Sequence, residues 1–334
     1  MKLIETEISL KSKLDRPYIS VIVPIYNENE NLKLLSDSLT SILNGTGKKY
    51  EIIFVDDGSS DGSFQLLKTI ADDNPFIRAI RFRRNFGQTA AMSAGFDYAC
   101  GEVIITMDGD LQNDPADIPR ILTKLEEGYD VVSGWRKNRQ DDFISRKLPS
   151  MIANKLISLM TGVRLHDYGC SLKAYRADIA KEVNLYGELH RFIPALAGIE
   201  GANVIEMPVM HHARRFGSSK YNILRTFNVI LDLITVVFIR KFMTRPLHMF
   251  GRAGMFSFAA GLLICGTLAY QKIAYSMQLS NRPMLLFGVL LILSGIQWIN
   301  TGIIAELQIR TYYESQNKSI YKIRELINFN DKDI

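Results

Sequence analysis

The chain has 334 residues, and its 40 lysines and arginines against 35 aspartates and glutamates give a formal net charge of +5. This length allows one large domain or two smaller ones, and so modest a charge does not require a nucleic-acid partner. The three cysteines lie far apart and form no C-x-x-C pair, which excludes a disulfide framework and favours a reducing compartment. Residues Met1–Arg16 contain no apolar stretch, so no cleavable signal peptide is expected.

Short apolar runs alternate with amphipathic segments from Ile19 to about Pro208. The runs predicted to be β-strands are 19–25, 51–55, 77–82, 103–107, 130–133 and 204–209. The segments predicted to be helices are 30–43, 63–71, 89–99 and 115–127. This alternation predicts an α/β domain with a mostly parallel sheet covered by helices on both faces.

Three polar clusters directly follow predicted strands. They are Tyr26-Asn27-Glu28, Asp56-Asp57-Gly58-Ser59 and Asp108-Gly109-Asp110. Because ligands of open α/β sheets bind beyond the carboxyl ends of the strands, we expect the three clusters to converge on one crevice.

The third cluster is a D-x-D triplet. Asp108 and Asp110 can hold a divalent cation against a diphosphate, and Gln112 can add an oxygen ligand. Oxygen ligands suit Mg²⁺ or Mn²⁺, whereas the five histidines lack the spacing of a Zn²⁺ site. The alternative is an ordinary acidic surface loop.

The second cluster contains Asp57, whose carboxylate can accept the imide N–H of a uracil. Pro24, Tyr26 and Glu28, from the neighbouring strand, can shape the same pocket. The alternative is a helix N-cap near Ser59 or Asp61. The sequence contains no P-loop and no G-x-G-x-x-G, which disfavours a dinucleotide-binding fold.

Two groups of basic residues follow the D-x-D triplet. Arg136 and Arg146 lie with Ser150 after the strand at 130–133, and Arg214, Arg215 and Lys220 lie before the apolar last third. Arginine binds phosphate through two parallel hydrogen bonds, so both groups are predicted to bind phosphates. The alternatives are solvated faces or contacts with anionic lipid headgroups.

Two stretches in the last third carry no charge, 253–270 with 18 residues and 284–305 with 22. A membrane span needs roughly 20 apolar residues, so both are predicted to be transmembrane helices, with a buried core hairpin as the alternative. Basic residues flank the pair on its outer sides, whereas the linker has only two (outer: Arg240, Lys241, Arg245, Arg252, Arg310, Lys318, Lys322, Arg324; linker: Lys272, Arg282). The positive-inside rule places both outer flanks and the large domain in the cytoplasm.

The segment 221–242 is apolar but interrupted by charges, and it is predicted to be an interfacial helix, with a packed domain helix as the alternative. Ser257 and Gly261 form a small-xxx-small pair that indicates helix association, which leaves homo-oligomerisation open. The expected domains are a catalytic domain at 1–210, a juxtamembrane segment at 211–246, two transmembrane helices at 247–307 and a cytoplasmic tail at 308–334.

At its motifs the sequence resembles the inverting family-2 glycosyltransferases of GT-A fold. Within that family it is similar to the polyprenyl-phosphate glycosyltransferases, such as the bactoprenol glucosyltransferases and undecaprenyl-phosphate aminoarabinose transferases, and more distantly to dolichol-phosphate mannose synthase. The resemblance covers about residues 20–307. The motifs that carry it are Pro24-Ile-Tyr-Asn-Glu28, Val55-Asp-Asp-Gly-Ser59, Arg84-Asn-Phe-Gly-Gln-Thr-Ala-Ala91, Asp108-Gly-Asp-Leu-Gln-Asn-Asp-Pro115, Asp167-Tyr-Gly-Cys170 and Arg214-Arg-Phe-Gly-Ser-Ser-Lys-Tyr221.

The resemblance implies a role for each matching position. The nucleotide-binding residues would be Pro24, Tyr26, Glu28, Asp57, Gln88 and Asp108, with Asp57 reading the base. The metal would be Mg²⁺ or Mn²⁺, held by Asp108, Asp110 and Gln112. The lipid phosphate would lie on Arg136, Arg146 and Ser150, with Arg214 and Lys220 in a segment that closes over the diphosphates. Asp110 and Asp167 would be the catalytic residues, with Asp167 beside the sugar or the acceptor, where it orients a group or assists as a base. A strong base is not needed, because a phosphate monoester has a second pKa near 6 and is already a nucleophile at neutral pH.

The implied function is a membrane-bound inverting transfer of a hexose from a UDP-sugar to undecaprenyl or another polyprenyl phosphate. Glucose is the first expectation, and 4-amino-arabinose derivatives, mannose and GlcNAc stay open. The expected location is the bacterial inner membrane, with a multi-pass chain, a cytoplasmic catalytic domain and no nucleic-acid partner. One rival is a processive polysaccharide synthase, which usually carries a Q-x-x-R-W motif that is absent here. The other is a non-catalytic membrane module that binds sugar nucleotide or anionic lipid.

Overall fold

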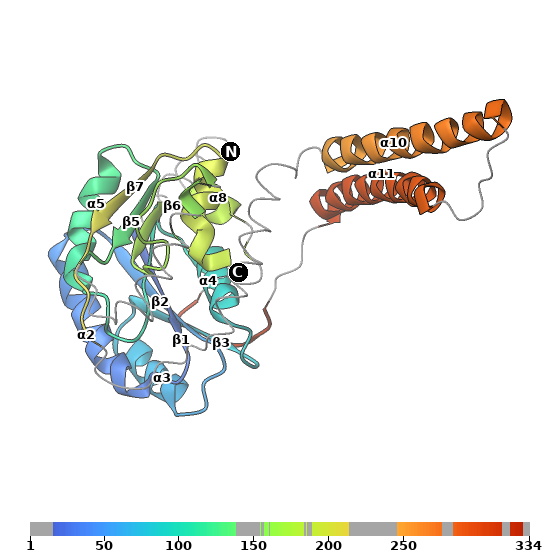
Figure 1. Ribbon diagram of the computed structural model, residues 1–334. Helices are drawn as coiled ribbons and strands as arrows, with labels where there is room; N and C mark the ends of the chain where they lie inside the picture. The colour runs from blue at the N-terminus through green and yellow to red at the C-terminus, as the bar shows by residue number, and fades with distance from the viewer. Residues whose placement is uncertain are drawn as a thin grey trace, which may run out of the picture. The chain divides into compact units, whose positions relative to one another are not determined.

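A computed structural model of the chain describes residues 16–137, 154, 157–159, 161–183, 185, 189–213, 246–275, 283–315 and 321–329. The chain divides into two compact units. The first contains Met1–Val236 and Ser319–Ile334, and the second contains Val237–Lys318. In the described residues the first unit is an α/β domain and the second is a pair of long helices (Figure 1).

The first unit is built on one eight-stranded sheet with the order β7-β5-β6-β4-β1-β2-β3-β8. The pairs β1–β2, β1–β4, β2–β3 and β5–β7 are parallel, whereas β6 pairs antiparallel with β4 and β5, and β8 pairs antiparallel with β3. The sheet is therefore mostly parallel, as predicted. The strands are β1 (Ile19–Ile25), β2 (Tyr50–Asp56), β3 (Ile77–Phe82), β4 (Val103–Thr106), β5 (Val131–Trp135), β6 (Lys173–Arg176), β7 (Val204–Pro208) and β8 (Ile323–Ile327).

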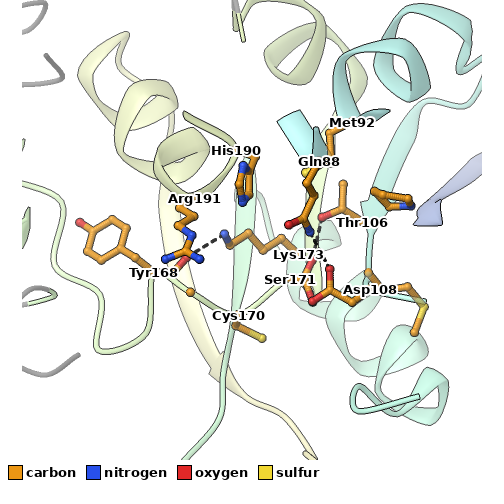
Figure 2. Close-up of a pocket in the computed structure, with 13 residues that line it drawn as sticks. Gln88, Met92, Thr106, Asp108, Tyr168, Cys170, Ser171, Lys173, His190 and Arg191 are labelled. Atoms are coloured by element: carbon orange, nitrogen blue, oxygen red, sulfur yellow. Dashed lines mark hydrogen bonds between the residues drawn. The ribbon is translucent and has the colours of Figure 1, made fainter. Parts of the chain in front are cut away.

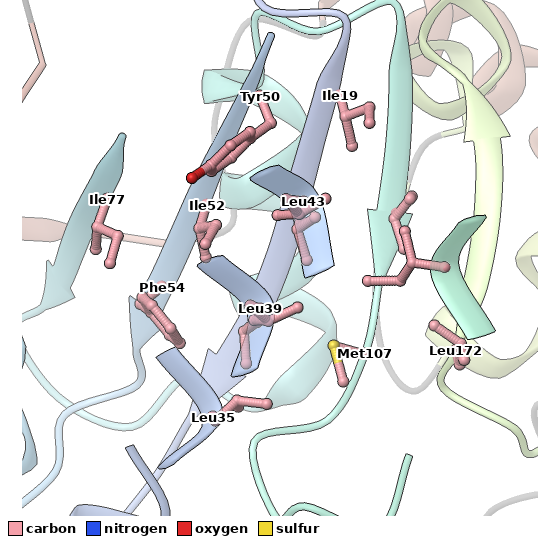
Figure 3. Close-up of a cluster of buried hydrophobic side chains, with 14 of the residues drawn as sticks. Ile19, Leu35, Leu39, Leu43, Tyr50, Ile52, Phe54, Ile77, Met107 and Leu172 are labelled. Carbon is pink, nitrogen blue, oxygen red and sulfur yellow. The ribbon is translucent and has the colours of Figure 1, made fainter. Parts of the chain in front are cut away.

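Helices cover both faces of this sheet (Figure 1). The helices of the first unit are α2 (Asn29–Gly45), α3 (Ser63–Asp73), α4 (Gln88–Tyr98), α5 (Ile118–Glu126), α7 (Ala177–Glu182) and α8 (Ile193–Ile199), with short 3₁₀ turns η1 (Pro115–Asp117) and η3 (Leu189–Phe192). On one face, α2 places Leu35, Leu39 and Leu43 against Ile52 and Phe54 of β2 (Figure 3). On the other face α4 packs closely on β1. A Cβ on Gly95 of α4 would lie 2.3 Å from the Ile22 side chain, so that position needs glycine.

Two strands of the sheet were not predicted. β6 is a buried four-residue strand that carries Lys173, and β8 lies beyond the second long helix, within the predicted tail. The predicted strands 19–25 and 77–82 have the same bounds in the structure, and the others differ by one or two residues at an end. The sequence between 308 and 334 thus contributes a strand to the α/β domain instead of being only a tail.

The second unit consists of α10 (Pro246–Tyr275) and α11 (Pro283–Ser315). Both contain a stretch long and apolar enough to cross a membrane, Phe250–Tyr275 and Pro283–Ala305, with mean hydropathies of 1.6 and 1.7. Only 17% and 11% of the most apolar windows are buried inside the chain, unlike the core helix of a soluble protein. The two helices approach closely through glycines, since a Cβ on Gly261 would lie 2.6 Å from the Gly288 carbonyl oxygen.

Candidate active site

The three polar clusters expected to converge follow β1, β2 and β4, which are neighbours in the sheet. Hydrogen bonds join the first two loops. The Asp57 N–H donates to the Ile25 carbonyl at 2.8 Å, and the Asn27 N–H donates to Ser59 Oγ at 2.9 Å. The clusters therefore lie at one edge of the sheet, where parallel α/β folds bind their ligands.

Asp57 is buried and holds the loop that precedes α4. Its two carboxylate oxygens accept the backbone N–H groups of Phe86 at 2.6 Å and Gly87 at 2.9 Å. Burial raises the pKa of Asp57 to about 6, although these two N–H donors act in the opposite direction. A carboxylate has about four acceptor positions, so it can still accept a further N–H from a base. The N-cap position of α3 is Gly62, and the neighbouring Asp61 accepts the Ser63 N–H at 3.0 Å.

The same loop delivers Gln88 to the D-x-D triplet. Gln88 Nε2 donates to Asp108 Oδ1 at 2.8 Å, and Asp110 Oδ1 accepts the Gln112 N–H at 3.2 Å. Burial and the nearby charge of Asp110 raise the pKa of Asp108. A cation bound beside these two carboxylates would neutralise the charge of both.

The donor set at this triplet fits a metal that also takes phosphate ligands. Within the described ranges, no group of three or more His, Cys, Asp or Glu residues is arranged to hold an ion, so the carboxylate ligands would be Asp108 and Asp110. Mg²⁺ is commonly bound by one or two carboxylates together with substrate phosphates and waters. Gln112 was predicted as a third ligand. Its backbone carbonyl accepts the His212 N–H at 2.8 Å.

Arg136 and Asp167 form a buried ion pair. Arg136 donates from Nε to Asp167 Oδ2 at 2.7 Å and from NH2 to Oδ1 at 2.9 Å, and the two side chains are 14% and 7% exposed. Burial acts to lower the pKa of Arg136, but the hydrogen bonds and charge of Asp167 outweigh it and raise the pKa overall. Asp167 Oδ1 also accepts the Gly169 N–H at 3.1 Å. Since both carboxylate oxygens are engaged, the geometry favours an orienting role for Asp167.

The structure describes three of the remaining predicted site residues, and four others lie outside the described residues. Pro24 lines a pocket beside Asp108, Tyr26 is 38% exposed just after β1, and Glu28 Oε2 accepts from Asn31 Nδ2 at 2.6 Å. The other predicted phosphate-binding residues lie outside the described residues, as does the predicted interfacial helix at 221–242 (Arg146, Ser150, Arg214, Lys220).

The pocket beside Asp108 includes three basic residues that the sequence reasoning missed (Figure 2). Lys173 lies on β6, and His190 and Arg191 lie on η3. His190 Nδ1 is 2.7 Å from Thr89 Oγ1 in the first turn of α4. One sequence feature could have indicated this pocket, namely the lysine inside the otherwise apolar run 172–175. A charged residue is rarely buried in a strand unless it has a partner or a ligand.

The chain is similar to known proteins over most of its length. Residues 20–183 match the family described as Glycosyl transferase family 2. A curated relative, dodecaprenyl-phosphate galacturonate synthase of Rhizobium johnstonii, is 47% identical over 314 residues and is covered over 93% of both chains. The chain therefore belongs to glycosyltransferase family 2 and is a glycosyltransferase. The resemblance to the polyprenyl-phosphate glycosyltransferases of that family is confirmed by this relative.

Solved structures show the same fold at low identity. Mannosyl-3-phosphoglycerate synthase from Rubrobacter xylanophilus superposes with a TM-score of 0.54 at 13% identity, over 69% of this chain and 76% of its own. Glucosyl-3-phosphoglycerate synthase from Mycobacterium tuberculosis, in complex with Mn²⁺, UDP-glucose and phosphoglyceric acid, gives 0.51 at 17% identity over 69% and 81%. The predicted GT-A-like α/β fold is thus confirmed.

Proposed function

We propose that this enzyme transfers a hexuronate, with galacturonate as the first candidate, from its UDP-linked form to a polyprenyl phosphate with inversion at C1. The observation that carries the proposal is the 47% identity, over 93% of both chains, to a dodecaprenyl-phosphate galacturonate synthase. The acid pair Asp108 and Asp110 and the buried Arg136–Asp167 pair at the same end of the sheet support it.

The relative changes the expected sugar. The sequence motifs favoured glucose, whereas the relative's name specifies galacturonate. Glucose is therefore kept as a comparison donor, together with the other neutral hexoses and the amino sugars.

In the proposed reaction, an oxygen of the lipid phosphate attacks C1 of the sugar, the bond between C1 and the β-phosphate oxygen breaks, and UDP leaves. Asp57 holds the loop of Gln88 and accepts the base N–H, which positions the donor. Arg136, fixed by Asp167, holds the acceptor phosphate near C1 despite the repulsion of the two anions. Asp108 and Asp110 would hold a divalent cation, which would supply positive charge to the leaving diphosphate.

The proposed location is the bacterial inner membrane, with α10 and α11 spanning it. The seven strands before α10 and the strand β8 after α11 belong to one sheet, because β8 pairs with β3. Both ends of the pair then lie on one side, and the basic outer flanks place that side in the cytoplasm. Cysteine labelling from outside intact spheroplasts should modify a cysteine placed in the 276–282 linker and leave one placed in the α/β domain unmodified.

The proposal is tested with the purified full-length protein in lipid nanodiscs. Polyprenyl phosphate, Mg²⁺ or Mn²⁺ and radiolabelled UDP-galacturonate should yield a label that extracts into organic solvent and is released by mild acid. Parallel reactions contain UDP-glucose, UDP-GlcNAc and GDP-mannose. An absence of extractable label with every donor contradicts the proposal, and a polymeric product supports the processive alternative.

The role of Asp108 and Asp110 is tested separately, with a carboxylate outside the site as the control. Asp110→Ala should lower turnover on the order of 100-fold or more, since it removes a charge that acts on the leaving group. Asp37→Ala removes a carboxylate that is 59% exposed and pairs with Lys33 on α2, and it should leave the rate unchanged. A near-normal rate for the Asp110 variant contradicts the metal assignment. UDP-dependent thermal stabilisation without any turnover in the wild type supports the non-catalytic alternative.

A further inference from the structure

A pocket lies beside Asp108. Figure 2 shows Lys173, Arg191 and His190 around it, with Gln88 and Asp108 on the opposite wall. Its other described lining residues are small, apolar or neutral (Pro24, Met92, Thr106, Met107, Tyr168, Gly169, Cys170, Ser171). Among the described residues that line this pocket, three are basic and one, Asp108, is a carboxylate.

Lys173 is a buried cation without a matching anion in the described part of the chain. The residue is 3% exposed, and Nζ donates to the Tyr168 carbonyl oxygen at 3.1 Å. No described carboxylate oxygen forms an ion pair with Nζ within 4.0 Å, and Asp167 and Asp108 act on it only through charge at longer range. Burying an ammonium group is costly unless it is paired, so this position points to a ligand that brings a negative charge.

The size of the pocket restricts that ligand. The pocket offers about 30 Å³ to the centres of water-sized molecules. One water needs roughly 10–15 Å³ on that measure, so there is room for two oxygen atoms and not for a hexose ring. A carboxylate at the end of a sugar has this size and charge.

The position of the pocket identifies the sugar. It shares Asp108 with the proposed cation site, so a group that enters it is attached close to the donor diphosphate. Arg136, which is proposed to hold the acceptor phosphate, does not line it. A group carried by the transferred sugar meets both conditions.

We propose that Lys173 and Arg191 bind the C6 carboxylate of the transferred hexuronate and thereby select uronate donors over neutral hexoses. This inference rests on the proposed function. The Arg191 guanidinium suits bidentate binding of a carboxylate, and Lys173 supplies a second charge from β6. His190 anchors η3 to the first turn of α4 through Thr89, next to Gln88, which keeps Arg191 in register with Asp108.

The test compares UDP-galacturonate with UDP-galactose, which differ only in the carboxylate at C6. The wild-type kcat/KM should favour the uronate strongly. Arg191→Gln and Lys173→Met should each lower kcat/KM for UDP-galacturonate by roughly 10- to 100-fold, the value of one charged hydrogen bond, and leave UDP-galactose nearly unchanged. Arg176→Gln is the matched control, because Arg176 also belongs to β6 but is 44% exposed beside Asp130 and outside the pocket.

Stability separates this role from a structural one. Lys173→Met removes a buried charge, so its thermal midpoint should be at least as high as that of the wild type, although the uronate preference is lost. A wild type that uses both donors equally overturns the inference and leaves the transfer reaction intact. Equal losses for both donors also overturn it and assign the two residues to the phosphates.

Donor binding by titration calorimetry with Mg²⁺ tests the pocket even without turnover. If no lipid product forms with any donor, the proposed reaction fails. The inference then stands only if UDP-galacturonate binds more tightly than UDP-galactose in the wild type and equally in Arg191→Gln.

Discussion

Arg136 and Asp167 depend on each other because Asp167 is buried and the Arg136 side chain is only 14% exposed. Asp167→Asn removes one of two buried charges and leaves the other without its partner, which costs about 3–5 kcal/mol. We expect a matching fall in the free energy of unfolding, measured by denaturation in detergent, together with loss of lipid-product formation.

The conservative variant separates charge from geometry. Arg136→Lys keeps the charge but lacks the planar fork that donates from Nε and NH2 to two oxygens. Its KM for polyprenyl phosphate should rise with little change in the affinity for UDP. An unchanged KM would contradict the assignment of the acceptor phosphate to Arg136.

The uronate reaction should have an alkaline limit set by Lys173. Burial lowers the pKa of Lys173 to about 8, with Arg136 acting in the same direction and Cys170, Asp167 and Asp108 opposing it. The ammonium form is therefore present below about pH 8 and is lost as the pH rises through that value. We expect kcat/KM for UDP-galacturonate to fall above pH 8, since this ratio reports the free enzyme. Lys173→Arg should move the fall to higher pH, and UDP-galactose should not show it.

At the scale of the element, the helix pair depends on glycines. Gly254, Gly261, Gly288 and Gly295 all lie where an added Cβ would come within 2.6–2.8 Å of the facing helix. Ser257 Oγ also donates to the Leu291 carbonyl oxygen at 2.8 Å across the pair. Such close approach lets backbones pack tightly, which is the main source of helix association where burial from water is absent.

Gly261→Leu should therefore separate the helices. The new side chain would meet the Gly288 backbone, which cannot move as a flexible side chain can. We expect a loss of roughly 1–3 kcal/mol, typical of overpacking, seen as a lower thermal midpoint in detergent. Gly266→Leu is the control, because nothing lies within 4 Å of a Cβ there. Equal effects of the two variants would contradict a glycine-mediated contact.

The elements differ in how well the sequence predicts them, for physical reasons. β1 reads as a continuous apolar run because both of its faces are buried, so its bounds are predicted correctly. β6 was not predicted because it begins with Lys173, and a charged residue argues against a buried strand. Lys173 lines the pocket beside Asp108. β8 contains Arg324 and Glu325 and is a strand only because β3 offers it an edge, and that pairing joins residues far apart in the chain.

The same contrast applies to the site. Asp108, Gln88 and Asp167 lie in local motifs that sequence reasoning can recognise. Arg191 and Lys173 reach the pocket from η3 and β6, and only the folded sheet brings these two elements to Asp108. Their contribution to specificity depends on tertiary packing, which no spacing along the chain reveals.

At the scale of the whole molecule, the end of the chain is firmly attached to the α/β domain. The Tyr321 ring stacks on Phe82 with centroids 5.3 Å apart, and its hydroxyl donates to Asp97 at 2.8 Å. Asn328 Nδ2 donates to the carbonyl oxygens of Ala71 and Ile77, at 2.8 Å each. These contacts hold β8 against β3.

A chain that stops after residue 318 should lose these contacts and expose the edge of β3. We expect a loss of roughly 2–5 kcal/mol, as for truncation of large buried side chains, and faster aggregation. A chain that stops after residue 329 retains β8 and is the control. Thermal unfolding and light scattering check both, and equal stability of the two chains would contradict a structural role for β8.

The late position of β8 also sets an order of events during synthesis. The ribosome completes seven strands of the sheet before either long helix emerges, and the eighth only after both. Domains fold as their segments become available, so the nascent catalytic domain waits with the edge of β3 unpaired until the hairpin has been made and released. A chain whose synthesis stopped within α10 or α11 would lack β8, and the open edge of β3 would mark that chain for chaperones and proteases.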